Sequence, residues 1–359
     1  MTIKNKKVVV AMSGGVDSSV VAGMLKEEGY DVIGITLQLY KSNQEIKSKT
    51  CCSGVDIYDA KEVARKLDIP HYILNYQENF KKTVINNFID SYKKGETPIP
   101  CVQCNQHIKF EDLLLTAKGL GAEFLATGHY IRKKTINNIN GLFKAKDESK
   151  DQSYFLFQVK EKDLSFLKFP LGDLLKEETR LLAKKFEIPV ADKPESQDIC
   201  FIPDGDYRQF LSKYKGFKRS GNILDLKNNL LGKHDGIENY TIGQRKHINV
   251  AINKPLYVVK IIKETNSIVV GEKEDLKSSE IHIDQLNWLG DKIYIKKKFC
   301  DNLNIKVRSM QKPMKGKLEF LKNNHGKVLL DKYTYAVSKG QGCVFYNNQD
   351  QLLGGGWIK

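Results

Sequence analysis

The sequence predicts an α/β fold in which a doubly wound parallel sheet is followed by β-rich segments. Two observations predict it. In the first part of the chain, short apolar runs alternate with amphipathic helical patterns, and beyond about residue 203 short alternating segments between Gly and Asn turns replace the helices. Alternation of apolar strands with helices is typical of a parallel sheet that helices cover on both faces.

Hydrophobic periodicity and turn signals predict the elements of the first part in order. Residues 8–11 and 32–37 are apolar runs of the buried-strand type, and the helical pattern between them, at 18–28, ends at Gly29. Further helices are expected at 55–67, 78–92, 107–119, 146–158 and 176–186, and further strands at 71–74 and 123–126.

The second part of the chain predicts a small β-rich module and then a barrel or sandwich. We divide the chain into domains at 1–203, 204–277 and 278–359. Short strands are expected at 237–242, 256–262, 267–271, 292–295, 305–309, 317–320, 327–330 and 343–346.

The turn between the first strand and the first helix is the most informative stretch of the chain. Adjacent glycines let a backbone approach a ligand closely, and the following helix start favours an anion such as phosphate or pyrophosphate. No Lys follows the glycines as it does in G-x-x-x-x-G-K-[ST], which points away from γ-phosphoryl transfer and towards chemistry at the α-phosphate of ATP. After Ala11 and Met12, this turn reads Ser13-Gly14-Gly15-Val16-Asp17-Ser18.

Two more positions are expected to lie beside this turn. In doubly wound sheets, ligands bind beyond the carboxyl ends of the strands, near the point where the strand order reverses. Leu37 and Gly128 each follow or end an expected strand. We therefore expect both to share one site with the glycine turn.

The charge balance favours a polyanionic partner. The chain has 58 Lys and Arg against 43 Asp and Glu, a formal net charge of +15, which is typical of nucleic-acid-binding proteins but also of a Lys-rich, solvated surface. No secretory signal is evident, and no stretch approaches the roughly 20 apolar residues of a membrane span. We therefore expect a cytoplasmic protein without a membrane partner, in which the seven cysteines act in catalysis or metal binding rather than in structural disulfides.

The cysteines fall into distinct settings. Cys101 and Cys104 form a C-x-x-C just ahead of an expected helix, whose dipole favours the thiolate. Cys200 lies in a polar, irregular stretch at 191–200. The C-x-x-C has three interpretations. It could be part of a zinc site, with Cys200 or with Cys51 and Cys52, which open another expected helix. It could also be a thioredoxin-like dithiol, or contain a reactive cysteine that works with Cys200 in sulfur transfer. Cys300 and Cys343 fall in β segments and are expected to be inert core residues.

The S-G-G-x-D-S turn resembles the pyrophosphate loop of the ATP pyrophosphatases. Further motifs are Cys-Cys-Ser at 51–53, T-P-I-P-C-V-Q-C-N-Q-H-I-K-F at 97–110, A-T-G-H-Y at 126–130, K-D-Q-S-Y-F-L at 150–156, E-S-Q-D-I-C-F-I at 195–202, and the segment from Gly-Gln at 340–341 to Phe-Tyr at 345–346. With these motifs in this order, the chain resembles the bacterial tRNA-specific 2-thiouridylases over essentially its whole length.

This resemblance implies an ATP-pyrophosphatase domain, a small β-rich linking domain and a C-terminal β-barrel that helps to grip tRNA. The implied reaction uses ATP and Mg²⁺ to replace the 2-carbonyl oxygen of the wobble uridine by sulfur, in tRNAs for Lys, Glu and Gln. The residues implied to hold ATP are Ala11, Met12, Ser13, Gly14, Gly15, Val16, Asp17, Ser18, Leu37 and Gly128.

The resemblance also implies roles for two cysteines and for a tRNA-contacting set. Cys200 would receive a persulfide from a sulfur carrier or relay protein, Cys104 would be the catalytic nucleophile, and the two would end each cycle as a disulfide that must be reduced. The implied tRNA contacts are His129, Lys150, Asp151, Gln152, Arg308 and Gln341. Simpler readings stand beside three of these assignments, because Asp17 can serve as a helix N-cap, His129 as a structural histidine at a strand end, and the segment 150–152 as a charged helix start.

One departure from the family pattern leaves alternatives open. Many members carry Asn-Pro-Asp before the nucleophile, whereas this chain has Ile99-Pro100-Cys101, which puts a general acid or base at that position in doubt. Cys101, Cys104 and Cys200 would then be a three-thiolate set for an iron–sulfur cluster. A synthetase of the argininosuccinate type and a non-catalytic, ATP-sensing RNA-binding protein are further alternatives, neither of which needs two thiols in polar segments.

Overall fold

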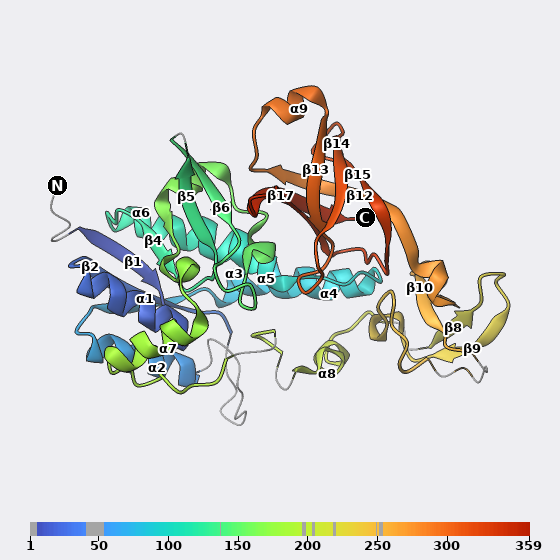
Figure 1. The fold of residues 1–359 in the computed structure, drawn as a ribbon. Helices are drawn as coiled ribbons and strands as arrows, with labels where there is room; N and C mark the ends of the chain where they lie inside the picture. Colours follow the sequence, from blue (N-terminus) through green and yellow to red (C-terminus); the bar gives the residue numbers. More distant parts are fainter. Residues whose placement is uncertain are drawn as a thin grey trace. The chain divides into compact units, whose positions relative to one another are not determined.

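A computed structural model describes residues 6–40, 54–136, 138–195, 199–202, 205–217, 220–248, 250 and 254–359. The chain, drawn in Figure 1, divides into two compact units. Unit 1 comprises Met1–Val84, Cys101–Asp206 and Gln349–Leu352, and unit 2 comprises Ile85–Pro100, Tyr207–Asn348 and Leu353–Lys359.

Unit 1 is built on a parallel sheet, which confirms the predicted fold class. Its strand order is β3-β2-β1-β4-β7, so the chain moves outward in one direction from β1 and then returns to the other side through β4. The order therefore reverses between β1 and β4. The strands are β1 (Lys7–Ala11), β2 (Asp31–Gln38), β3 (His71–Asn75), β4 (Leu125–Thr127) and β7 (Leu167–Lys168).

The central strand is apolar because both of its faces are covered. Val8, Val9 and Val10 of β1 are completely buried. Val8 and Val10 pack in one cluster with side chains of α1 (Val16–Glu27), α2 (Gly54–Lys66) and α7 (Lys176–Lys185), which gather on one side of the sheet (Figure 1). Consecutive buried valines are expected in a parallel sheet that is covered on both faces, because successive side chains of a strand point to opposite faces.

Two long helical stretches contain π-helical turns. The predicted helix at 78–92 is α3 (Gln77–Phe80), the π-helix η1 (Lys81–Ile85) and α4 (Asn86–Lys93). The predicted helix at 107–119 begins earlier than expected, with α5 (Pro100–Gln103), and continues as the π-helix η2 (Cys104–Leu113) and α6 (Leu114–Gly119). Pro is favoured at the first position of a helix, which accounts for the earlier start.

The helix expected at 146–158 is wrong. The side chains of Asp147 and Asp151 accept hydrogen bonds from nearby backbone N–H groups, which competes with helix formation. Only the 3₁₀ turn η3 (Ser153–Leu156) forms there. A hairpin that the sequence reading missed precedes it, β5 (Arg132–Ile136) with β6 (Ile139–Phe143), and the 3₁₀ turns η4 (Glu161–Phe166) and η5 (Pro170–Asp173) follow.

Unit 2 contains a small four-stranded sheet in the order β10-β11-β8-β9. Its core includes Ile223, Val258 and Ile268, all completely buried. The strand expected at 237–242 is wrong, because that segment forms the 3₁₀ turn η7 (Ile237–Asn239). The elements here are α8 (Tyr207–Ser212), β8 (Gly221–Leu224), β9 (Leu230–His234), β10 (Tyr257–Ile262), β11 (Ser267–Gly271) and η8 (Lys273–Leu276).

The last strands form a closed barrel, which confirms the predicted barrel. Their order is β12-β15-β14-β13-β16-β17, and β17 pairs back onto β12. Cys300 and Cys343 lie in its core, and burial raises the pKa of the Cys300 thiol to about 11, as expected of inert thiols. The strands are β12 (Lys277–Trp288), β13 (Phe299–Lys306), β14 (Met314–Phe320), β15 (Gly326–Tyr335), β16 (Gly342–Tyr346) and β17 (Gln351–Ile358).

Two details of the barrel correct the sequence reading. The strand expected at 292–295 is the short helix α9 (Ile293–Lys297), at whose start the Asp291 carboxylate accepts a hydrogen bond from the backbone of Ile293. The strand expected at 305–309 ends at Lys306, so Arg308 lies in a bend after β13 rather than on a strand. None of the helices in the described part of the chain is long and apolar enough to cross a membrane.

Candidate functional site

The glycine turn after β1 is held in place by its own side chains and by the neighbouring strand. The backbone N–H of Ser13 donates to Ser18 Oγ at 3.1 Å, and Thr36 Oγ1 donates to the Met12 carbonyl at 2.9 Å. Gly14 has a φ of +74°, and a Cβ there would overlap the carbonyl oxygen of Asp56. The turn therefore requires glycine at position 14 both for its backbone conformation and for its packing against α2.

The helix that follows begins without a side-chain cap. Gly15 is the N-cap residue of α1, with φ −97° and ψ 165°, and no side chain caps its N-terminus. The Ser19 hydroxyl donates to the Gly15 carbonyl at 2.8 Å instead. The first N–H groups of α1 are thus available to an anion, and the helix dipole favours negative charge at the same place. The simpler reading of Asp17 as the N-cap is wrong, because its carboxylate is engaged elsewhere.

Gly128, which is expected to share this site, lies against the turn, and β2, the strand that carries Leu37, pairs beside the start of the turn. Gly128 directly follows β4, and a Cβ there would lie 2.8 Å from the backbone nitrogen of Ser18. Leu37 is buried in β2, and the Met12 N–H donates to the carbonyl of Ile35 on the same strand at 2.8 Å. The reversal of strand order between β1 and β4 therefore coincides with the glycine turn, as the fold rule predicts.

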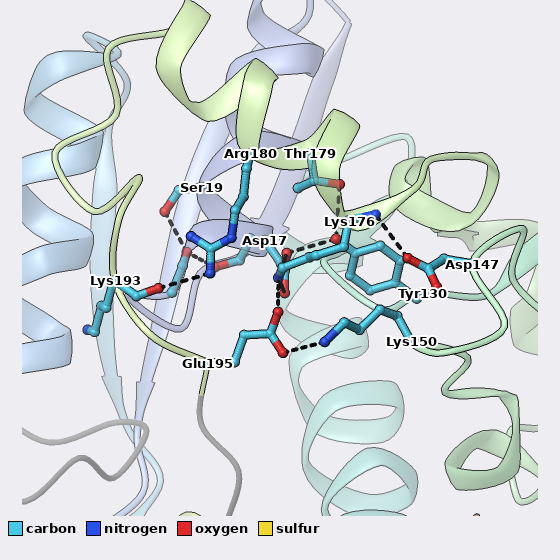
Figure 2. Close-up of polar contacts among 12 residues, drawn as sticks. Asp17, Ser19, Tyr130, Asp147, Lys150, Lys176, Thr179, Arg180, Lys193 and Glu195 are labelled. Atoms are coloured by element: carbon cyan, nitrogen blue, oxygen red, sulfur yellow. Dashed lines mark hydrogen bonds and ion pairs between the residues drawn. The ribbon is translucent and has the colours of Figure 1, made fainter.

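Asp17 is bound by a lysine from a distant helix. Lys176, the first residue of α7, places Nζ 2.7 Å from Asp17 Oδ1 and 3.0 Å from Oδ2 (Figure 2). The Tyr130 hydroxyl donates to the same carboxylate at 3.0 Å and lies 2.9 Å from the Thr179 hydroxyl. Burial, followed by the charge of Asp17, raises the pKa of Tyr130, so the phenol stays protonated as a donor.

Glu195 extends this network away from the turn. Its carboxylate lies 3.0 Å from Lys176 Nζ and 2.7 Å from Lys150 Nζ (Figure 2). Burial alone would raise the pKa of Glu195, but the hydrogen bonds from the two lysines outweigh it and hold that pKa below its ordinary value. One lysine thus joins the carboxylate in the first turn of α1 to a carboxylate five positions before Cys200 in the sequence.

Lys193 binds the other side of the turn. Its ammonium group lies 3.0 Å from the Gly14 carbonyl, 2.6 Å from Asp56 and 2.5 Å from Asp59. Burial alone would lower the pKa of Lys193, but these two carboxylates outweigh it and raise that pKa. A cation is thereby fixed beside the glycine turn, although none follows the glycines in the sequence.

The segment 150–152, expected to contact tRNA, lies beside the same network. The Tyr130 N–H donates to Gln152 Oε1 at 2.9 Å, and the Gln152 N–H donates to the Tyr130 carbonyl at 3.0 Å. Asp151 accepts hydrogen bonds from Ala145 N–H at 3.0 Å and from Ser153 N–H at 3.2 Å. Its carboxylate therefore shapes the local chain.

His129 packs among aromatic rings. Its Nδ1 lies 2.8 Å from the Thr127 hydroxyl, and its ring centroid lies 5.8 Å from that of Phe110 and 6.4 Å from that of Phe169. Burial lowers the pKa of His129 well below its ordinary value, and the charge of Lys109 acts in the same direction. His129 is therefore neutral at pH 7.

The C-x-x-C lies inside a helix rather than ahead of it. Cys101 is exposed in the first turn of α5, whereas Cys104 is buried at the first residue of η2. Asn105 Nδ2 donates to the Phe155 carbonyl at 3.2 Å, which joins this helix to the segment that follows residue 152.

Cys200 is partly buried, and the residues after it are firmly packed. Phe201 and Ile202 are 6% and 1% exposed, and the Phe201 ring meets Phe80 edge-on at 5.7 Å. The predicted roles of Cys51 and Cys52, and the part of the 195–202 motif at 196–198, lie outside the described residues. Within the described residues, no three His, Cys, Asp or Glu side chains are grouped closely enough to hold a metal ion.

The two tRNA candidates in unit 2 both make backbone contacts. Arg308 is exposed, and its guanidinium donates to the carbonyls of Tyr335 and Ala336. Gln341 Nε2 donates to the Thr97 carbonyl at 2.8 Å, and the Thr97 N–H donates to the Lys339 carbonyl at the same distance. The turn before β16 thus holds the chain seven positions before Cys104.

Three domain models match consecutive parts of the chain: the tRNA methyl transferase HUP domain at 6–204, the tRNA methyl transferase PRC-barrel domain at 208–272 and the aminomethyltransferase beta-barrel domain at 278–358. The tRNA-specific 2-thiouridylase MnmA of Rickettsia felis is 51% identical over 357 residues, which cover 99% of this chain and 97% of that protein. The chain belongs to the tRNA-specific 2-thiouridylase family. The enzyme of Rickettsia conorii is 52% identical over 99% of this chain and 96% of its own length.

Family membership agrees with the pyrophosphate-loop turn and implies the use of ATP. Among solved structures, the U34-tRNA thiolase NcsA from Methanococcus maripaludis with its 4Fe-4S cluster is 21% identical. It covers 59% of this chain and 65% of its own, with a TM-score of 0.36, which is too low for a comparison of sites.

The sequence reading missed the partners of Asp17. Lys176 was expected only as the start of a helix, and Tyr130 only as part of a motif. The sequence does contain one indication of this pair. A lysine at the first position of a helix is destabilised by the helix dipole, which predicts that a carboxylate lies close to it. The sequence alone does not show which carboxylate, because Asp17 lies 159 positions away.

We predict that Gly14→Ala destabilises this thiouridylase-family protein more than Gly29→Ala does. Both glycines have positive φ, +74° and +90°, which costs a side-chain-bearing residue about 1–2 kcal/mol. Only at Gly14 would a Cβ also overlap Asp56, whereas nothing lies within 4 Å of a Cβ at Gly29. Urea unfolding followed by circular dichroism measures both variants, and equal losses would contradict the packing of Gly14 against α2.

We also predict a pH dependence of stability from His129. Its folded pKa lies below the unfolded value of about 6.5, so below that pH the unfolded chain binds more protons and the free energy of unfolding falls. This contribution is fully present above about pH 6.5 and is lost as the pH falls towards the folded pKa. Thermal unfolding between pH 7.5 and pH 5.5 should show a smaller decline for His129→Asn than for wild type, and His247→Asn, at an exposed site, should decline as wild type does. Identical slopes for wild type and His129→Asn would show that His129 titrates normally.

Proposed function

We propose that this protein is an ATP-dependent tRNA 2-thiouridylase. It would adenylate the 2-carbonyl oxygen of the wobble uridine in tRNAs for Lys, Glu and Gln and replace that oxygen by sulfur, releasing pyrophosphate and AMP. The observation that carries the proposal is the uncapped start of α1 at Gly15, in the same compact unit as Cys104 and Cys200.

The glycine turn supplies the binding site for the pyrophosphate of ATP in this proposal. Backbone N–H groups from Gly14 to Ser18 would hold the phosphate oxygens, with Ala11, Met12, Leu37 and Gly128 around the nucleoside. Lys176 and Lys193 lie beside the turn and would offset phosphate charge. Mg²⁺ bound to the phosphates would lower the remaining charge.

Adenylation solves the chemical difficulty of the reaction. A pyrimidine carbonyl oxygen is a poor leaving group, and attack of this oxygen on the α-phosphate expels pyrophosphate and converts the oxygen into part of AMP. The terminal sulfur of a Cys200 persulfide then attacks C2, and AMP leaves. Attack of the Cys104 thiolate on the Cys200 sulfur frees the thiocarbonyl and leaves a Cys104–Cys200 disulfide, which a reductant must open. The alternative order, in which Cys104 first releases sulfide from the persulfide, gives the same products.

Burial of Cys104 implies that the nucleophile becomes accessible only during the cycle. Its side chain is 8% exposed, whereas Cys101 one turn earlier is exposed. We propose that Cys101, which replaces the family Asp, takes no part in sulfur transfer. The described residues do not gather the three cysteines into a cluster-binding group, so their arrangement does not fit the iron–sulfur alternative.

For the tRNA side, we propose that His129, Lys150, Gln152, Arg308 and Gln341 contact RNA. Since His129 is neutral at pH 7, its contact would be a hydrogen bond or stacking with a base rather than an ion pair with phosphate. Asp151 would act by shaping its segment, because its carboxylate binds the backbone there. The net charge of +15 supports a polyanionic partner.

Other assignments follow from the same reading. We propose domain limits at 1–203, 204–277 and 278–359, a cytoplasmic location where thiols stay reduced, and a persulfide carrier or relay protein as sulfur donor. A methyl transferase activity, as in the description of two domain models, and an argininosuccinate-type synthesis need no pair of cysteines. The cysteine variants in the next paragraph distinguish thiolation from these two activities.

We predict that Cys104→Ser and Cys200→Ser each lower 2-thiouridine formation by about three orders of magnitude or more, because each removes a sulfur atom that takes part in bond formation. Cys101→Ser is the matched control from the same helix and should keep most of the activity. The assay combines ATP, Mg²⁺, a persulfide donor and unmodified tRNA, with digestion and mass spectrometry of the nucleosides. Undiminished product from either of the first two variants would contradict the two-cysteine mechanism, and loss in Cys101→Ser would favour the cluster.

A further inference from the structure

The ammonium group of Lys193 binds the glycine turn through a backbone carbonyl. Its Nζ lies 3.0 Å from the carbonyl oxygen of Gly14. Two carboxylates of α2, those of Asp56 and Asp59, lie 2.6 Å and 2.5 Å from the same nitrogen. A lysine ammonium group has three N–H donors, and these three oxygens engage all of them. Lys193 therefore has no donor left for a phosphate oxygen, and its contact with the turn must act through the peptide that it holds.

The peptide that Lys193 holds is the one between the two glycines. The C=O and the N–H of a trans peptide point in opposite directions, and the described residues contain no cis peptide bond. Because the Gly14 carbonyl points towards Lys193, the N–H of Gly15 points away from it. In the part of the chain that the structure describes, this N–H has no hydrogen-bond acceptor. An unpaired donor is thus held at the uncapped start of α1.

This peptide needs an anchor from outside the turn. A peptide between two glycines rotates more freely than others, because no Cβ on either side restricts it. The next peptide is fixed by α1 itself, since the hydroxyl and the N–H of Ser19 donate to the Gly15 carbonyl at 2.8 Å and 3.3 Å. The Gly14 carbonyl is fixed instead by Lys193, which comes from a segment 179 positions away in the sequence.

Lys193 is itself held firmly enough to serve as this anchor. Its side chain is 26% exposed, and those of Asp56 and Asp59 are 10% and 20% exposed, so water screens these ion pairs only partly. Arg180 of α7 donates to the carbonyl of Ala191 at 2.8 Å and lies 3.5 Å from that of Lys193 (Figure 2). The backbone and the side chain of Lys193 are therefore both bound to neighbouring elements.

We propose that Lys193 is a positioning residue that orients the Gly14–Gly15 peptide so that the Gly15 N–H donates to phosphate groups bound at the start of α1. The donor then has its orientation before the anion arrives, and a preorganised donor contributes more to binding than one that must first be turned. This inference deepens the proposed function and rests on it for the identity of the anion.

The test follows the Gly15 amide by NMR in the full chain, with glycine labelled by carbon-13 at the carbonyl and by nitrogen-15. Correlations between a labelled carbonyl and the following labelled amide then arise only from Gly–Gly peptides, which are Gly14–Gly15 and the two within 354–356. Gly15→Ala assigns the first signal by removing it. That substitution is sterically mild, because φ is −97° and the nearest atom to a new Cβ lies 3.5 Å away.

Inorganic pyrophosphate is the probe. We expect it to move the Gly15 amide proton of wild type downfield and to leave the signals of 354–356 in place. In Lys193→Met this response should be largely lost, and the affinity for pyrophosphate, measured by calorimetry, should fall about tenfold or more, as for the loss of one charge-assisted hydrogen bond. A wild-type Gly15 amide that does not respond at saturation, or a response that persists in Lys193→Met, would overturn the proposal.

Two further variants separate positioning from charge and from general destabilisation. Lys184→Met removes the same charge from an exposed position of α7, and it should respond as wild type does. Lys193→Ala should lose the Gly15 response, and propylammonium, which supplies the atoms that this substitution removes, should restore it. Tetramethylammonium carries the same charge without an N–H donor and should not restore the response. Equal restoration by both cations would show that charge alone matters and would overturn the proposal.

The NMR test and the thiolation assay fail independently. If wild type forms no 2-thiouridine while pyrophosphate shifts the Gly15 amide only when Lys193 is present, the proposed function is wrong and the positioning role stands. If thiolation proceeds while Lys193→Met leaves the Gly15 response unchanged, the positioning role is wrong and the proposed function stands.

Discussion

The ion pair between Asp17 and Lys176 is the interaction on which the described site depends. It joins the first turn of α1 to the first residue of α7, two elements separated by 159 positions in the chain. Lys176 alone would be unfavourable where it lies, because it opposes the dipole of its own helix, and the Asp17 carboxylate offsets that cost. Their pairing fixes α7 against the nucleotide turn, and Tyr130 and Glu195 then attach the strand end after β4 and the chain before Cys200 to the same point.

In the proposed function, this arrangement supplies the cations that a phosphate loop usually carries in its own sequence. In a G-x-x-x-x-G-K-[ST] loop, the cation is part of the turn itself, whereas here Lys176 and Lys193 arrive from other elements and are held by carboxylates. Each of these lysines also makes a second contact. Lys176 contacts Glu195 at 3.0 Å. Lys193 contacts the Gly14 carbonyl at 3.0 Å as well as the carboxylates of Asp56 and Asp59 in α2. Lys176 thus contacts both the turn proposed to bind ATP and the residue five positions before Cys200.

The parts of this fold with local sequence signals were predictable. Val8–Val10 and Gly14 identify the central strand and the turn, since burial on both faces and a positive φ leave few alternatives. Segments whose structure depends on a side-chain to backbone hydrogen bond could not be predicted. Asp147 and Asp151 replace an expected helix by turns, and Asp291 starts a helix where a strand was expected. The helical position of Cys104 was within reach, because Pro100 marks a helix start. The Asp17–Lys176 ion pair could not be predicted from the sequence, since no local pattern indicates which distant carboxylate a lysine will contact.

In the proposed function, ATP held by the glycine turn converts the uridine oxygen into part of a leaving group. The most direct measurement uses tRNA that carries oxygen-18 at O2 of the wobble uridine, in a single turnover with ATP, Mg²⁺ and persulfide donor. Mass spectrometry of the products should find oxygen-18 in the phosphate of AMP, one pyrophosphate for each AMP and one 2-thiouridine for each labelled AMP. ADP and inorganic phosphate, or AMP without the label beside thiolated tRNA, would contradict it.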